Sequence, residues 1–111
     1  METKNAEVIL STENKILTAA VRGEIDHHCA RAVREEIDAA LLTEGPDKLV
    51  IDMSGVTFMD SSGLGLVLGR YTKAEATGIG FAVRGAGGRV RQMFDMAGME
   101  RIITFEGEMD T

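Results

Sequence analysis

Two adjacent serines behind an acidic residue form the part of this sequence best suited to chemistry. Asp60, Ser61 and Ser62 are followed by Gly63 and Gly65, at the point where an apolar stretch ends and a helical pattern begins. A serine in such a place is a candidate nucleophile, a candidate phosphate ligand or a candidate site of modification. These three kinds of chemistry need different neighbours, so the rest of the sequence can distinguish them.

The surroundings of the serines argue against a hydrolase. The nucleophile elbow has glycine two residues before its serine, and here Met59 and Asp60 hold those positions. His27 and His28 are the only histidines, and nothing in the sequence supports either as a catalytic base. They also make a weak metal motif, because adjacent helical side chains point about 100° apart. We therefore expect no catalytic residue and no metal ligand, and the single Cys29 is expected to be a small buried hydrophobic residue.

A nucleotide-binding domain is a weaker alternative. The glycines within residues 63–69 miss the dinucleotide-binding pattern by one residue, and no P-loop lysine follows them. Residues 84–91 combine glycines with three arginines before a predicted helix, a composition that suits a phosphate cradle. A flexible turn with solvated arginines is the favoured explanation of this segment, and no cofactor is expected.

The helix expected after Asp60 carries a stripe of small residues. Ser61, Gly65 and Gly69 are spaced by four and share one face, which is predicted to be partly exposed with Leu66 beside it. The inward face is predicted to comprise Leu64, Val67, Leu68, Tyr71 and Ala74. Each interior glycine costs about 0.8–1 kcal/mol relative to alanine, so the pair needs an explanation. Either the helix approaches the sheet or another helix closely, or the backbone of another protein approaches the stripe; the spacing alone favours neither.

Strands and helices alternate along the chain from residue 15 onward. Strands are expected at residues 8–10, 15–24, 48–53, 79–83 and 102–105, with turns at Asn14-Lys15 and Ser54-Gly55. Helices are expected after Asp26, which is the predicted N-cap of the first, after Asp60, and around Phe94. This order predicts one α/β domain over residues 1–111, with a mixed, largely parallel sheet of about four to five strands and helices packed on it.

Charge and hydropathy narrow the class of function. The chain has 111 residues, a net charge of −6 and no basic stripe, so we expect it to bind neither nucleic acid nor an anionic membrane. The polar N-terminus, the absence of a long apolar run and the single cysteine predict a cytoplasmic protein. What remains is a serine at the start of a helix, as the recipient of a phosphate. A helix N-terminus tolerates the added charge of about −1.5 to −2.

Four motifs spread over most of the chain carry a resemblance to a known family. They are Gly-Glu-Ile-Asp-His-His at 23–28, Phe-Met-Asp-Ser-Ser-Gly-Leu-Gly at 58–65, Leu-Gly-Arg-Tyr at 68–71 and Met-Phe-Asp-Met-Ala-Gly at 93–98. The chain resembles the anti-sigma factor antagonist family, which has the STAS fold, and its Asp-His-His and Asp-Ser-Ser forms are most similar to the sporulation branch. Two features depart from the family: Gly87-Gly88 replaces a frequent proline, and Thr111 follows soon after the last predicted strand, where a longer helix is usual.

The resemblance implies a partner-switching mechanism. The unphosphorylated protein would bind an anti-sigma factor that is itself a serine kinase, of the stage II sporulation protein AB type, and so release a sporulation sigma factor. That kinase would use its own ATP to phosphorylate Ser61 and end the binding, and a serine phosphatase of the stage II sporulation protein E type would restore it. The contact surface carried over from the family comprises Asp26, His27, Asp60, Ser62, Gly65, Leu66 and Gly69. A general stress-branch antagonist and a sensory STAS module in a larger complex are the alternatives.

Overall fold

A β-hairpin begins the part of the chain that the computed structural model describes, residues 6–107. Strand β1 (Ala6–Glu13) runs antiparallel to β2 (Ile16–Ile25), and the two are joined by Asn14 and Lys15. Both linking residues have positive φ, 53° and 64°, as a two-residue hairpin turn between twisted strands requires. The predicted turn is confirmed, while β1 is longer than the predicted strand at residues 8–10.

Five strands form one sheet in the order β1-β2-β3-β4-β5. Strand β3 (Lys48–Met59) lies parallel to β2, and β4 (Gly80–Arg84) and β5 (Thr104–Glu106) continue the parallel arrangement. The segment from Leu49 to Ile51 is at most 1% exposed, as expected of a central strand that is buried on both faces. The predicted mixed, largely parallel α/β sheet is confirmed.

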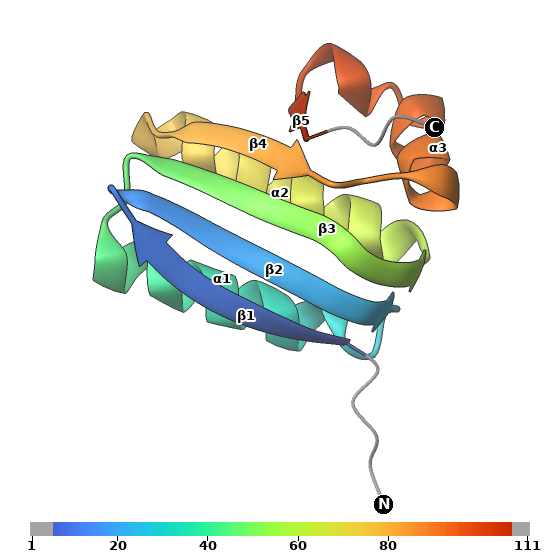
Figure 1. Ribbon diagram of the computed structural model, residues 1–111, viewed down its shortest axis with the longest axis horizontal. Coiled ribbons are helices and arrows are strands. Elements are labelled where there is room, and N and C mark those ends of the chain that lie inside the picture. The colour runs from blue at the N-terminus through green and yellow to red at the C-terminus, as the bar shows by residue number, and fades with distance from the viewer. Residues whose placement is uncertain (1–5, 108–111) are drawn as a thin grey trace, which may run out of the picture.

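Helices α1 (Ala30–Glu44) and α2 (Ser61–Thr77) lie side by side across one face of the sheet, and the shorter α3 (Gly88–Met96) lies near β5 (Figure 1). A single turn of 3-10 helix, Met99–Arg101, connects α3 to β5. The core between sheet and helices is mainly aliphatic; its fully buried side chains include Leu17, Ile25, Ile37, Leu49, Ile51, Val67 and Phe94. No helix within residues 6–107 combines the length and apolar character needed to cross a membrane.

The predicted turn at Ser54-Gly55 is wrong, because β3 continues through both residues. Gly55 pairs with Arg22 of β2, and the register between the two strands shifts on either side of this pair. A Cβ on Gly55 would lie 2.8 Å from Arg22 Cγ, so the glycine here makes room for a neighbouring side chain. The lengthened strand ends at Met59, two residues before α2 begins at Ser61.

Candidate functional site

Ser61 is the first residue of α2, and its side chain is exposed. Asp60 is the N-cap: its backbone is extended, and its Oδ1 accepts a hydrogen bond from Ser62 N at 2.8 Å. The backbone N–H of Asp60 donates to Ile25 O at 3.1 Å, which holds the cap against the end of β2. Strand pairing and capping together therefore fix where Ser61 is presented to solvent.

The turn that follows β2 lies beside this cap. Asp26 Oδ1 accepts hydrogen bonds from His28 N at 3.0 Å and Cys29 N at 3.2 Å. Helix α1 begins only at Ala30, and its N-cap residue Cys29 makes no side-chain cap. The prediction that Asp26 caps the helix is thus wrong, because a turn intervenes and Asp26 stabilises that turn instead.

His27 and His28 lie in the turn and not on the helix, so the predicted 100° separation does not apply. Their rings lie with centroids 4.0 Å apart and planes tilted by 37°, and both residues are exposed. Cys29 is half-buried, in contrast to the expected full burial, and its Sγ donates to Glu24 O at 3.3 Å. Burial raises the pKa of this thiol, which disfavours the reactive thiolate. No group of three potential metal ligands occurs within residues 6–107.

Helix α2 is rotated relative to the prediction. Its buried residues are Gly63, Leu66, Val67, Arg70 and Ala74. Leu68, which was predicted to face inward, is 41% exposed, and Leu66, which was predicted to lie beside the exposed stripe, is only 4% exposed. Leu64 and Tyr71 are partly buried and pack at the margin of the core. The helix therefore turns a face that contains a glycine and an arginine toward the protein, and leaves one leucine outside.

The glycines of α2 separate into two kinds. A Cβ on Gly63 would lie 2.1 Å from Met59 Cγ, so no larger residue fits there without rearrangement. A Cβ on Gly65 or Gly69 would meet no heavy atom within 4 Å. Close packing inside this molecule therefore explains Gly63 and leaves Gly65 and Gly69 unexplained. We call Ser61, Gly65 and Gly69 the open stripe.

A cleft of about 380 Å³ lies between the start of α1 and the start of α2. Four of the residues predicted to bind a partner line it together: His27, Ser62, Gly65 and Leu66. Ala30, Arg31 and Arg34 complete the lining. Neither arginine was predicted for the site from the sequence. The signal for them is helical spacing, since positions 27, 30, 31 and 34 recur at three and four residues along one face. We call this hollow the basic cleft.

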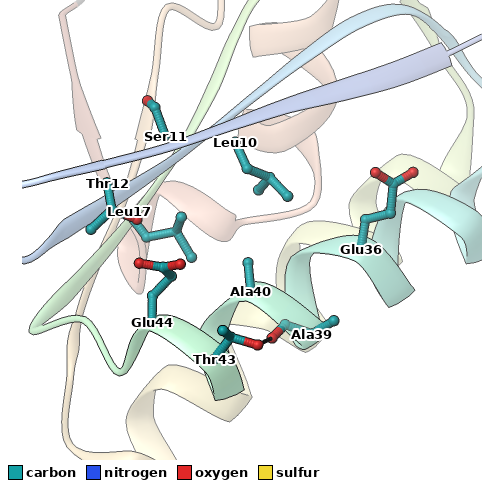
Figure 2. A pocket seen from close by; sticks show the side chains of 9 residues that line it. All are labelled: Leu10, Ser11, Thr12, Leu17, Glu36, Ala39, Ala40, Thr43 and Glu44. Atoms are coloured by element: carbon teal, nitrogen blue, oxygen red, sulfur yellow. Dashed lines mark hydrogen bonds between the residues drawn. The ribbon is translucent and has the colours of Figure 1, made fainter.

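Another hollow, of about 570 Å³, lies between β1 and the second half of α1 (Figure 2). Leu10 and Leu17 line its sheet side, and Glu36 and Glu44 extend from the helix. Its lining includes none of the residues predicted for the site. Although it is larger than the basic cleft, it brings together no group of residues with an evident chemical role.

The loop at residues 84–91, the candidate phosphate cradle, is held in place by contacts with neighbouring residues. Arg91 pairs with Asp95 at 2.9 Å, and its guanidinium lies 4.3 Å from the centroid of the Phe105 ring. Ala86 is only 4% exposed, and a Cβ on Gly85 would lie 2.8 Å from Ser54 Cβ. These contacts hold the loop against β3 and β5, so they weaken the nucleotide-binding alternative.

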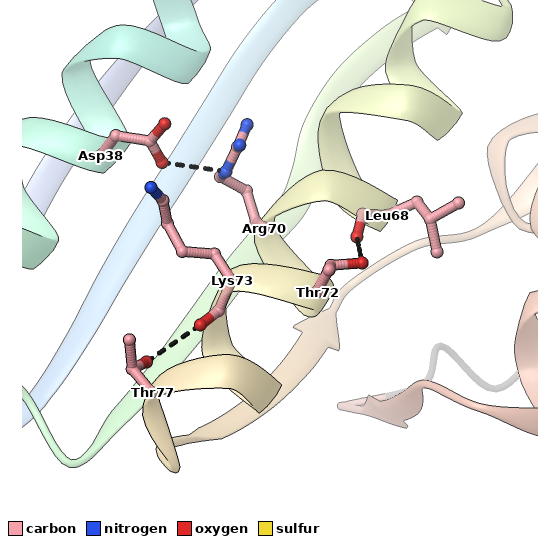
Figure 3. Close-up of polar contacts among 6 residues, drawn as sticks. All are labelled: Asp38, Leu68, Arg70, Thr72, Lys73 and Thr77. Atoms are coloured by element: carbon pink, nitrogen blue, oxygen red, sulfur yellow. Dashed lines mark hydrogen bonds and ion pairs between the residues drawn. The ribbon is translucent and has the colours of Figure 1, made fainter.

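A buried ion pair joins the two helices that form the cleft. Arg70 Nε lies 2.9 Å from Asp38 Oδ1, and Arg70 is 6% exposed (Figure 3). The contact is not an aligned hydrogen bond, and Arg70 Nη1 has no hydrogen-bond partner within the described part of the chain. Burial lowers the pKa of Arg70, while the charge of Asp38 opposes the shift. The pair therefore couples α1 to α2 through charge as well as packing.

Comparisons with known proteins identify the family of this chain. The family model described as STAS domain matches residues 7–111. An anti-sigma F factor antagonist of Paenibacillus polymyxa is 32% identical over 99 residues, covering 89% of this chain and 85% of the relative. An anti-sigma-B factor antagonist of Listeria monocytogenes is 33% identical over 93 residues, covering 81% of each chain.

Solved structures show the same fold. The anti-sigma factor antagonist SpoIIAA in its unphosphorylated form superposes with a TM-score of 0.77 at 27% identity, over 89% of this chain and 87% of that one. An anti-sigma factor antagonist from Mycobacterium paratuberculosis gives a TM-score of 0.83 at 27% identity, over 92% and 86% of the two chains. The chain therefore belongs to the STAS domain family and, within it, to the anti-sigma factor antagonists.

Proposed function

We propose that this protein is a phosphorylation-controlled antagonist of an anti-sigma factor that is itself a serine kinase. In its unphosphorylated form it binds that kinase and releases a sporulation sigma factor, and phosphorylation of Ser61 ends the binding. The observation that carries the proposal is the exposure of Ser61 at the start of α2, at the head of an open stripe that packing inside the molecule does not explain.

The two serines differ in a way that favours Ser61 as the phosphate acceptor. The side chain of Ser61 is exposed, whereas Ser62 is half-buried and lines the basic cleft. The backbone N–H of Ser62 is already engaged by Asp60. A relative of similar fold, the Bacillus cell fate determinant SpoIIAA, has been solved in a phosphorylated form, with a TM-score of 0.71 at 26% identity.

Phosphorylation at this position is compatible with an intact fold. The phosphate would add about −1.5 to −2 charge at the positive end of a 17-residue helix, where the dipole favours an anion. Within the first turn of α2 no residue is acidic, and the one carboxylate next to it is that of the N-cap Asp60, which is bonded to Ser62 N. Gly65 lies one turn further along the same face, about 5–6 Å away as residues four apart are in a helix. The phosphate would therefore block a partner's approach to the open stripe by charge and bulk.

The proposed partners are those that the resemblance to the sporulation branch implies. The kinase is of the stage II sporulation protein AB type and supplies the ATP, and a serine phosphatase of the stage II sporulation protein E type reverses the modification in the cytoplasm. Beside the residues of the basic cleft, the proposed contact surface includes Asp26 and Asp60, whose turns flank the cleft, and Gly69 on the open stripe. In this scheme the chain is a substrate and a binding module and performs no catalysis.

Phosphate mapping tests the site. Incubation of the wild-type protein with the anti-sigma kinase and ATP is expected to add one phosphate, which mass spectrometry locates on Ser61. The Ser61→Ala variant should remain unmodified, while the matched Ser62→Ala variant should still accept one phosphate. A phosphate on Ser62, or none on the wild-type protein, contradicts the proposal.

A phosphate mimic separates a binding switch from a folding effect. Ser61→Asp is expected to weaken kinase binding by at least tenfold, measured by calorimetry, and to leave the thermal midpoint within about 2 °C of wild type, because aspartate suits a helix N-terminus. If the variant loses binding only together with stability, the switch works by disrupting the fold and the proposed mechanism is wrong.

A stress-response antagonist is the second candidate, and a specific observation favours it. The Listeria anti-sigma-B factor antagonist is as similar to this chain, at 33% identity, as the Paenibacillus anti-sigma F factor antagonist at 32%. A binding panel against one sporulation and one stress anti-sigma factor distinguishes the two. We expect the sporulation protein to bind at least tenfold more tightly, and the reverse preference would assign the chain to the stress branch.

A further inference from the structure

We propose that the basic cleft receives a carboxylate side chain from the anti-sigma factor, with Arg34 as its main anchor and Arg31 as a second donor. This inference rests on the proposed function and adds the chemistry by which the partner is recognised. It predicts that an Asp or Glu side chain on the kinase enters the cleft beside Ser62 when the kinase docks on the open stripe.

The charge of the cleft runs against that of the whole protein. The chain has a net charge of −6, yet the ionisable residues that line the cleft are His27, Arg31 and Arg34, with no acid among them. Arg31 is paired with Glu35 at 3.1 Å, but both side chains are largely exposed, 77% and 60%, so this contact is easily exchanged. Arg34 makes no ion pair within residues 6–107.

A buried ion pair lies next to the cleft, between Arg70 and Asp38. Arg70 on α2 is close enough to Arg34 for the Arg34 charge to contribute to its lowered pKa, after the larger effect of burial. Asp38 is the carboxylate that contacts Arg70. Asp38 thus balances the charge of Arg70 and leaves Arg34 as the cation that an incoming carboxylate would pair.

The cleft has room for a side chain of the partner. Its volume of about 380 Å³ is too small for a helix, and the side chain of Leu66, 4% exposed, contributes an apolar wall. Gly65 belongs to both the cleft and the open stripe, so a chain that lies on the stripe can direct a side chain past it into the cleft. A guanidinium matches a carboxylate with two parallel N–H donors, and Ser62 adds a hydroxyl at the same rim.

A partner carboxylate fits the cleft better than a nucleotide phosphate does. For transfer to Ser61, the terminal phosphate of the kinase's ATP must meet an exposed hydroxyl at the head of the open stripe. Ser61 is not among the residues that line the cleft, whereas Ser62 is. The cleft therefore lies to one side of the transfer point and remains available to a side chain of the kinase itself.

Charge variants of the full-length protein test the assignment. Arg34→Ala is expected to raise the Kd for the kinase about tenfold and Arg34→Glu about a hundredfold, as loss and reversal of one interfacial charge would. Arg101→Glu is the matched control: Arg101 is exposed on the 3-10 helix, outside the cleft lining, and its reversal changes net charge equally. Its Kd should stay within twofold of wild type, and circular dichroism should show that all three variants are folded.

A double-mutant cycle identifies the occupant. The acidic residues on the docking face of the kinase are neutralised one at a time, to Asn or Gln, and each variant is measured against wild type and Arg34→Ala. One of them should weaken wild-type binding about tenfold and have no further effect on Arg34→Ala. Additive effects at every acid would overturn the assignment, and so would an Arg34→Ala defect seen only with nucleotide bound, which points to a phosphate.

The outcomes also separate this inference from the function on which it rests. If wild-type protein binds the kinase and is switched at Ser61, while both Arg34 variants bind like wild type, only the assignment of the cleft is wrong. If wild-type protein fails to bind any anti-sigma factor, the proposed function fails and the cleft assignment fails with it.

Discussion

The buried face and the open face of α2 both contain glycine, but the space around the two kinds of position differs. On the buried face, a Cβ at Gly63 would collide with Met59, 2.1 Å away. On the open face, a Cβ at Gly65 or Gly69 would meet nothing within 4 Å. The first glycine is required by the packing of this molecule. The other two leave open space that no neighbouring residue fills.

The buried and open faces of α2 also differ in their effect on the stability of the domain. Val67 and Ala74 on the buried face are at most 1% exposed and stabilise the domain by removing apolar surface from water. Gly65 and Gly69 together lower helix stability by about 2 kcal/mol relative to alanine. A domain of this size has only about 5–15 kcal/mol of stability, so the loss at these two glycines is a substantial part of it. Binding of a partner backbone is the function that would explain this loss.

The largest effect is expected from the charge on the buried face. Asp38→Ala leaves the Arg70 guanidinium, 6% exposed, without its acid, and should lower the free energy of unfolding by about 2–4 kcal/mol. Urea denaturation measures this loss. Glu35→Ala breaks the exposed pair with Arg31 on the same helix and should cost at most about 0.5 kcal/mol.

Replacing both members of the buried pair tests whether the loss comes from an unpaired charge. Asp38→Leu combined with Arg70→Met should recover most of the stability lost in Asp38→Ala, because no buried charge then remains. If Asp38→Ala were as mild as Glu35→Ala, water would reach Arg70 and the buried face of α2 would end before that residue.

The next effect concerns the glycine on the buried face. Gly63→Ala should lower the free energy of unfolding by about 1–3 kcal/mol, because the new methyl group displaces Met59 from a site where it is 3% exposed. Chemical denaturation again provides the measurement. Adding Met59→Ala should make the double variant more stable than the sum of the two single losses predicts. Strict additivity would show that Met59 moves aside freely and that Gly63 is not required for packing.

The fold was largely predictable from the sequence, because alternation of apolar residues and helix stops act locally. Gly45 and Gly78 end their helices in left-handed conformation, with φ of 54° and 75°, a position for which glycine is the usual residue. The orientation of α2 was not predictable in this way. Hydropathy assigns Leu68 to the core and Arg70 to solvent, but Asp38, on a different helix, allows the arginine to be buried.

The candidate site was predictable in part for the same reason. The exposure of Ser61 and the openness of the stripe follow from spacing along one helix, and the structure agrees with both. The basic cleft depends on how α1 lies against α2, so the roles of Arg31 and Arg34 become visible only when residues some thirty positions apart are brought together. The turn at Asp26 was misread because an aspartate that caps a turn and one that caps a helix form the same local hydrogen bonds.

The smallest change in stability provides the sharpest test of the open face. Neither Gly65 nor Gly69 has positive φ, and an added methyl group meets open space at both, so alanine fits either position without strain. Each Gly→Ala change should raise the free energy of unfolding by about 0.5–1 kcal/mol, the difference in helix propensity. Both variants should nevertheless bind the anti-sigma factor more weakly, because the methyl group occupies the space that a partner backbone would enter.

A substitution that stabilises the protein and weakens its binding marks a position kept for function at a cost in stability, so this combination distinguishes the two faces. Calorimetry of binding and urea denaturation on the same samples measure both quantities. Ala76→Gly, an exposed change near the end of α2, is the control, and it should destabilise without altering the affinity. If Gly65→Ala and Gly69→Ala bind as tightly as wild type, the stripe is not approached by a partner. The two glycines would then lower helix stability without contributing to binding.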